Sequence, residues 1–211
     1  MNALNEYGGI AGWIGYPPSP AGPMPNDKAA WTSGSAPPLA PPPPGQEPLA
    51  NCPPDPYGGG SLCPSRANGI NSAGEVAVSV SGGPLSQVVI HYGPATAIVV
   101  PGLMSATAIN DTDTIVGQTP GFHAGVFTSD TTVDLGTFGG KSSVANAINA
   151  TGRVVGSAML AGDMATHAFL SDGAGLVDLG ELGGGMSEAW AVNDSGVVVG
   201  DSKTANGETH S

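Results

Sequence analysis

Residues capable of acid–base or metal chemistry recur at fixed places in this 211-residue chain. Histidine occurs at His123, His167 and His210, and aspartate follows the first two at Asp134 and Asp178. Equivalent histidines around an axis could hold a metal ion, and paired carboxylates are what glycoside hydrolysis requires. The same residues can also serve structure, because a His ring can bind a turn carbonyl and an Asp can cap a turn. Asp134 and Asp178 are the candidate catalytic pair, with turn capping as the alternative.

No metal or cofactor site is predicted. Lys28 and Gln87 occupy the His position in the earlier part of the chain, which interrupts a metal ring. The segment 110–113 resembles half of a calcium loop but lacks its glycine and its distant glutamate. No phosphate-binding loop, nucleophile elbow or metalloprotease His pair occurs. The triple glycines at 58–60 and 183–185 do not precede helices, so we interpret them as turns.

A motif of the form Asn-x-x-Gly followed by apolar residues recurs about every 40 residues. Asn suits the first position of a type I turn, and Gly three residues later suits the left-handed position that closes a hairpin with a bulge. Asp113 takes the Gly position once, and Asp tolerates positive φ better than most residues. The predicted turn-forming residues are Asn5, Gly8, Asn71, Gly74, Asn110, Asp113, Asn149, Gly152, Asn193 and Gly196.

Other sequence motifs that predict strands recur with the same period of about 40 residues. The segments 123–127 and 167–170 indicate a second strand type, with weaker copies at 28–31 and 87–90. A third strand with a glycine-rich exit is predicted at 133–140 and again at 177–184, while Ala189-Trp190-Ala191-Val192 indicates an apolar strand that buries Trp190. Four short strands per unit and no helical period predict an all-β repeat array of four-stranded units. A β-propeller, or an arc of an incomplete one, is favoured, and a β-solenoid is the alternative.

These motifs together resemble the HAF repeat of predicted extracellular bacterial proteins, which is named for a His-Ala-Phe tripeptide. That tripeptide is His167-Ala168-Phe169 here, and segments 178–184 and 192–196 carry further hallmarks. The match is good over 106–211, fair over 67–105 and partial over 1–34, with Gly125 in place of the Phe in one copy. The resemblance implies a secreted or surface-exposed repeat protein, and it brings no established activity or catalytic residues.

The period divides the chain into units. Residues 1–34 form a partial first unit, and 35–66 form a proline-rich insertion that holds Cys52 and Cys63. Four HAF-type units follow at 67–105, 106–144, 145–188 and 189–211, and the last is truncated. Because the chain begins and stops within repeats, we expect it to be a fragment of a longer protein, and an unpaired strand edge near 197–199 is expected to promote self-association.

Composition limits the partners. Five Lys plus Arg against 17 Asp plus Glu give a net charge of −12, which repels phosphate backbones and argues against nucleic acid. No apolar run approaches the length of a membrane span. Cys52 and Cys63 flank a segment rich in Pro and Gly that can fold back, so a disulfide is plausible there, with free thiols as the alternative. An extracellular or cell-surface location is expected, although the chain shows no export signal.

The favoured function is non-enzymatic: a secreted repeat domain for adhesion, or for binding a glycan or an extracellular protein. The exposed aromatic platforms that a glycan needs could come from Trp13, Trp31 or Trp190. The alternative is a glycoside hydrolase that uses Asp134 and Asp178.

Overall fold

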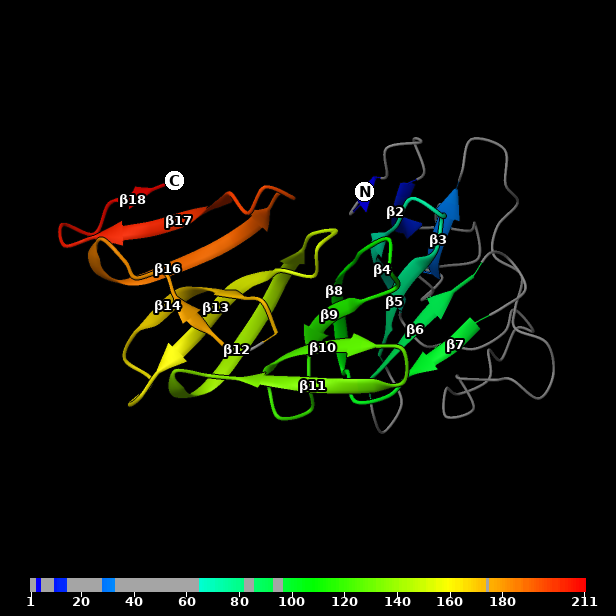
Figure 1. The fold of residues 1–211 in the computed structure, drawn as a ribbon, viewed down its shortest axis with the longest axis horizontal. Helices are drawn as coiled ribbons and strands as arrows, with labels where there is room; N and C mark the ends of the chain where they lie inside the picture. The colour runs from blue at the N-terminus through cyan, green and yellow to red at the C-terminus, as the bar shows by residue number, and fades with distance from the viewer. Residues whose placement is uncertain are drawn as a thin grey trace, which may run out of the picture. The chain divides into compact units, whose positions relative to one another are not determined.

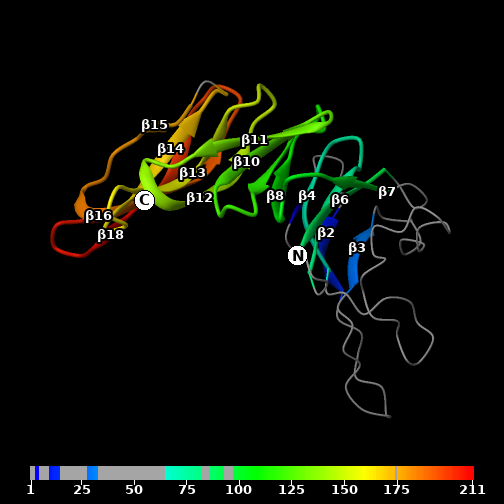
Figure 2. The same ribbon diagram turned by 90° about the horizontal axis from the view of Figure 1, so that it is seen from below.

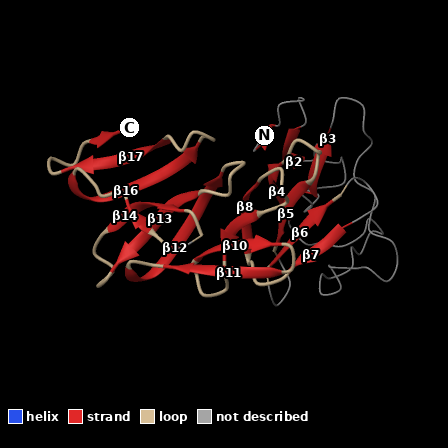
Figure 3. Cartoon of the chain, viewed as in Figure 1, coloured by secondary structure: helices blue, strands red, loops and turns tan. Residues whose placement is uncertain are grey.

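All secondary structure in the described part of the chain is β-strand, and the strands form open sheets (Figure 3). The computed structural model describes the backbone of Ala3–Leu4, Ile10–Ile14 and Lys28–Thr32, together with residues 65–81, 86–92, 97–173 and 175–211. The chain divides into two compact units, Met1–Ala106 and Thr107–Ser211, which are described separately. No helix in these residues is long and apolar enough to cross a membrane. Cys52, Cys63, Asn5 and Gly8 lie outside the described residues.

The described residues of the first unit form two antiparallel sheets. One has the order β1-β2-β3, with the bounds Ala3–Leu4, Ile10–Ile14 and Lys28–Thr32. The other is a four-stranded sheet in which neighbouring strands pair in chain order (Figure 1). Its strands are β4 (Ser65–Ile70), β5 (Val76–Val80), β6 (Gln87–His91) and β7 (Ala97–Val100). Short Val-rich strands joined by tight turns favour this meander.

The second unit begins within β8 and continues the same style of pairing. A four-stranded sheet runs in the order β11-β10-β9-β8, with the bounds Ser105–Ile109, Ile115–Gln118, Ala124–Thr128 and Thr131–Gly136 for β8 to β11. It is followed by a seven-stranded sheet made of two antiparallel sets. A single parallel pair, Thr166 with Met186, joins the two sets.

The two sets are named by their strands. The β12–β15 set contains Gly139–Ile148, Val154–Leu160, Thr166–Ser171 and Val177–Asp178. The β16–β18 set contains Gly183–Val192, Val198–Thr204 and Thr209–His210. Figures 1 and 2 both show β13 beside β14, and Figure 1 shows β16 beside β17. The pairing of β12 with β13 and that of β16 with β17 have the same register, including the same bulge.

The Asn-x-x-Gly hairpins have the backbone conformation that the pattern predicts. Gly74, Gly152 and Gly196 have φ values of 85°, 85° and 84°, and Asp113 has 58°. In the hairpin between β12 and β13, the Gly152 N–H donates to Asn149 O over 3.1 Å, and the Asn149 side-chain oxygen accepts from the Arg153 N–H over 2.8 Å. The asparagine therefore closes its own turn with both backbone and side chain.

Replacing Gly152 by Val should lower the free energy of unfolding by more than about 1 kcal/mol, because a β-branched residue is strained at positive φ. Ala150→Val in the same exposed turn is the control and should change stability by no more than about 0.5 kcal/mol. Urea denaturation followed by circular dichroism measures both. Equal effects of the two substitutions would show that the turn does not depend on the left-handed glycine.

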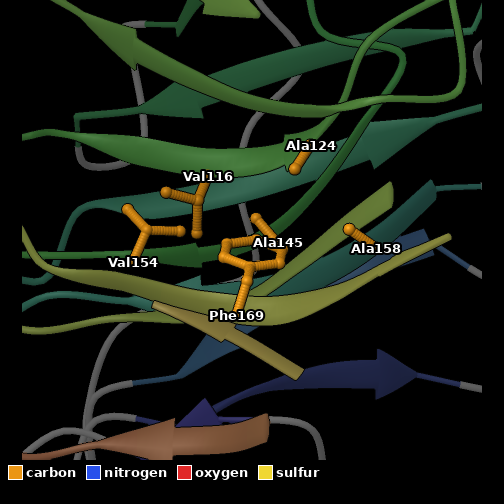
Figure 4. Close-up of a cluster of buried hydrophobic side chains, with 6 residues drawn as sticks. All are labelled: Val116, Ala124, Ala145, Val154, Ala158 and Phe169. Carbon is orange, nitrogen blue, oxygen red and sulfur yellow. The ribbon is translucent and has the colours of Figure 1, made fainter. Parts of the chain in front are cut away.

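The core of the second unit lies between the β8–β11 sheet and the β12–β15 set (Figure 4). Phe169 is fully buried there and contacts small or branched side chains from both sheets. The cluster comprises Val116, Ala124, Ala145, Val154, Ala158 and Phe169. A second cluster joins Val155 and Ala168 of the β12–β15 set to Ala189 of the next set. Phe169 is the one aromatic residue among the buried members of these two clusters, and the others are Val and Ala.

The strands do not follow every boundary that the sequence predicts. The unit boundaries predicted after 144 and after 188 fall inside β12 and β16, which begin at Gly139 and Gly183. The glycines at 183–185 are strand residues and not turns. A Cβ on Gly184 would lie 2.5 Å from the Lys203 Cβ, so close contact of neighbouring strands requires glycine. The proline-rich insertion is predicted to end at residue 66. The strand β4 already begins at Ser65, so the two ranges overlap by two residues.

Trp190 was predicted to be buried and is instead 50% exposed. It occupies the bulge of β16, where pairing with β17 shifts between Ala189 and Ala191. A bulge reverses the simple alternation of strand faces, so the apolar neighbours of Trp190 did not predict its direction.

Candidate functional site

The structure brings the repeated histidines and aspartates together in pairs. His123 Nδ1 lies 2.9 Å from Asp134 Oδ2, and His167 Nδ1 lies 2.9 Å from Asp178 Oδ2. In each pair the histidine lies at or just before the start of one strand and the aspartate is on the strand that follows, 11 residues later. The constant spacing of 11 residues in the sequence is the signal that could have predicted both pairs.

Each aspartate also caps a turn. The Gly136 N–H donates to Asp134 Oδ1 over 2.7 Å, and the Gly180 N–H donates to Asp178 Oδ1 over the same distance. Both glycines have positive φ, so the carboxylates stabilise a left-handed turn at the end of the strand. The carboxylates of Asp134 and Asp178 therefore have a structural role, which is to cap these turns.

Burial would raise the pKa of the Asp178 carboxyl, but the bonds from the His167 ring and the Gly180 N–H outweigh it and lower the pKa below its ordinary value. A carboxyl with a depressed folded-state pKa stabilises the fold above the unfolded-state pKa, and this contribution is lost as the pH falls through the folded-state pKa. The carboxylate is therefore ionised at neutral pH and suits a hydrogen-bond acceptor. A general acid would need the opposite shift.

Asp178→Asn should make stability less sensitive to acid. Between about pH 5 and about pH 3 the wild-type chain loses the contribution of the ionised Asp178, whereas the variant has none to lose. Urea midpoints measured across this range should therefore fall less steeply in Asp178→Asn than in the wild type. Parallel curves for the two proteins would mean that Asp178 does not act through its charge.

Two buried serines, which no sequence motif indicated, lie beside the two His–Asp pairs. Ser143 Oγ accepts from the Ala124 N–H over 2.7 Å and donates to Gly136 O over 2.6 Å. Ser187 Oγ makes the same two bonds, to the Ala168 N–H over 2.8 Å and to Gly180 O over 2.5 Å. Ser143 is 2% exposed and Ser187 is 4% exposed. Each hydroxyl is occupied by two backbone groups, which makes it a cross-link between strands and not a nucleophile.

A cavity of about 320 Å³ lies at the β16–β18 set. Its lining includes Ala168, Ala189 and Val198, together with three carboxylates, Glu181, Glu188 and Asp201. Within the described residues, no group of three or more His, Cys, Asp or Glu side chains is placed to hold a metal ion.

The three carboxylates that line the cavity are also engaged. Glu181 accepts from the Gly185 N–H over 2.8 Å, and Glu188 accepts from the Asn146 side chain over 3.0 Å. Asp201 accepts from the Ser211 hydroxyl and from the Trp190 indole N–H, and these two bonds lower the pKa of its carboxyl. The cavity therefore offers volume and a polar rim, and each of its three carboxylates already accepts a hydrogen bond from the protein.

The third candidate is an exposed apolar patch on β16–β17. Val199 is 57% exposed, whereas the residues at the same place after the two preceding turns, Val116 and Val155, are 0% exposed. Val197 and Trp190 are 58% and 50% exposed. We call Trp190, Val197 and Val199 the outer face, because Ala189 and Val198, which alternate with them, contact the β12–β15 set on the other side.

Side-chain hydrogen bonds also join successive units of this part of the chain. The Asn110 side chain donates to Asn149 O over 3.1 Å, and the Asn149 side chain donates to Asn193 O over 2.9 Å. Asn146, at the bulge position that Trp190 occupies in β16, donates to Ala189 O over 2.9 Å. The turns at Asn110 and Asn149 are thus each bonded to the turn that follows. Asn110 and Asn149 are buried, whereas Asn193, the last of this series, is exposed.

Comparisons of the chain with protein-family models, with curated proteins and with solved structures find no match.

Proposed function

We propose that this chain is a non-enzymatic, secreted repeat domain of the HAF type that serves adhesion by binding another protein through the outer face. The sheets would be successive blades of a β-propeller-like array. Support for the array comes from the shared register of β12–β13 and β16–β17 and from the side-chain bonds between successive turns. An extracellular location and the Cys52–Cys63 disulfide belong to the same proposal.

The observation that carries the binding function is the exposure of Val199 beside Trp190. An equivalent valine in each preceding sheet of the second unit is buried against the sheet that follows it. Exposed branched and aromatic side chains in a cluster are typical of protein interaction sites, and Trp is enriched in them. A second copy of the chain is a suitable partner, because two outer faces can pack on each other about a two-fold axis.

Sedimentation velocity at physiological salt tests this function. The wild-type chain should associate with rising concentration, and Val199→Asp should shift the midpoint of association at least about tenfold upward by placing a charge in the apolar contact. Val177→Asp is the matched control, because Val177 is 56% exposed and lies in β15, away from the outer face. A wild-type chain that stays monomeric, or equal effects of the two variants, would contradict binding by a second copy.

Glycan binding is the second candidate, favoured by one observation. The Trp190 indole is half exposed and its N–H is fixed by Asp201 over 2.9 Å, so the ring is held as a platform for a sugar face. Binding on a glycan array that is lost in Trp190→Ala and kept in Trp190→Phe would favour this candidate over a protein contact.

The glycoside hydrolase alternative receives less support from the geometry. Asp134 and Asp178 each accept bonds from a histidine and from the backbone N–H of a glycine two residues later. Turnover of chromogenic glycosides that disappears in Asp178→Asn would restore the enzyme hypothesis.

A further inference from the structure

The last strand of the β4–β7 sheet is apolar and exposed on both faces. β7 follows β6 at the edge of that sheet (Figure 1), and within the described residues it has a strand partner only on its β6 side. Ile98 and Val99 are successive, so they point to opposite faces, and they are 50% and 39% exposed. Their partners in β6, Ile90 and Val89, are 1% and 2% exposed. The exposure therefore follows from the edge position of β7.

Two edge strands of the second unit carry a carboxylate where β7 carries a valine. Asp134 on β11 and Asp178 on β15 each pair with the residue two positions after a histidine. Val99 pairs with the residue two positions after Gln87, which has the place of the histidine. The Gln87 side-chain oxygen is buried and has no hydrogen-bond partner in the described part of the chain, and a valine offers it no donor. The edge of β7 therefore lacks the charge that β11 and β15 present.

A charge at this place decides whether an edge strand can pair with its own copy. Two identical edge strands pair antiparallel about a two-fold axis, and a register centred on one residue places that residue opposite itself. Centred on Val99, this register also places Ile98 opposite Val100, so the facing side chains are all β-branched and apolar. The same register on β11 would place Asp134 opposite Asp134, and like charges directly opposite each other are destabilising. Self-pairing is therefore opposed at β11 and favoured at β7.

We propose that β7 is a self-association edge, at which two copies of the chain join their β4–β7 sheets into one continuous antiparallel sheet. Backbone hydrogen bonds between the two β7 strands hold the copies together, and burial of Ile98 and Val99 adds apolar contact on the two faces of the sheet. The strand itself is uncharged, whereas the net charge of −12 opposes association at longer range and is screened by salt. Pairing through β7 does not depend on the outer face, because it uses a different sheet.

Sedimentation velocity of charge variants of the full chain tests this register. All of them carry Val199→Asp, which weakens association through the outer face. The Val199→Asp chain should still associate, and adding either Val99→Asp or Val99→Lys should raise the midpoint concentration at least about tenfold, because like charges then face each other. An equimolar mixture of the Val99→Asp and Val99→Lys chains should associate again, since opposite charges are then paired. Val133→Asp on β11 is the matched control and should leave the midpoint unchanged.

A second variant separates lost association from lost folding. Val99→Asp combined with Gln87→His re-creates on β6 and β7 the pair that His123 makes with Asp134, so it should resist urea at least as well as Val99→Asp alone and still not self-associate. The proposal is overturned if the Val199→Asp chain stays monomeric, if the mixture of oppositely charged chains fails to associate, or if the variant with the re-created pair associates as strongly as its parent. An equal loss of association in the β11 control would overturn it too, because the effect would then not be specific to β7.

Discussion

Asn149→Asp is expected to lower the free energy of unfolding by about 2–3 kcal/mol, far more than the same change at Asn193. The Asn149 side chain is 5% exposed; its oxygen accepts from the N–H groups of Thr151 and Arg153, and its nitrogen donates to Asn193 O. Aspartate can still accept these bonds but loses the donated one, and it places a carboxylate in a buried position. The loss therefore reports the contact between successive turns.

Asn193→Asp is the matched control. Asn193 has the same position in its turn and accepts from the Val197 N–H over 2.9 Å, but it is exposed to solvent. Its replacement should change stability by no more than about 0.5 kcal/mol. Thermal and urea unfolding of the two variants provide the comparison. Similar losses at both positions would mean that the turn itself, and not the bond to the next turn, requires the amide.

Phe169→Ala is expected to destabilise the chain by about 3–5 kcal/mol, the range for removing a buried aromatic side chain. The ring is fully buried between two sheets, so the change opens a void that small neighbours such as Ala124 and Ala145 cannot fill (Figure 4). Phe122→Ala is the control, because the Phe122 side chain is 56% exposed. Phe and Ala both carry a Cβ. The strain of the positive φ at position 122 is therefore the same in the wild type and in Phe122→Ala.

Equilibrium unfolding in urea measures both variants. A loss at Phe169 no greater than that at Phe122 would contradict the assignment of this ring to the core between the sheets.

The all-β class and the positions of the turns could be predicted because they depend on local rules. Asn149 and Gly152 specify one hairpin by side-chain bonding and by tolerance of positive φ, and both effects act within a few residues. The pattern therefore contained enough information to place the hairpins. The resemblance to HAF repeats and the propeller arrangement are not decided by such rules and remain proposals.

The site could be predicted only in part, because its contacts depend on register and on neighbouring sheets. The spacing of His167 and Asp178 was visible, but only the pairing of β14 with β15 shows that they meet. The burial of Ser187 and the outward direction of Trp190 follow from the bulge and from the adjacent set. Apolar neighbours in sequence gave no sign of either.

The measurement that tests the outer-face account most directly is hydrogen–deuterium exchange of the chain at low and at high concentration. Association through the outer face predicts slower exchange at high concentration for peptides that contain Trp190 and for those that span Val197 to Val199, with no change around Val133, which is 55% exposed on β11. Protection around Val133 instead, or association without protection at Trp190 and Val199, would contradict the account.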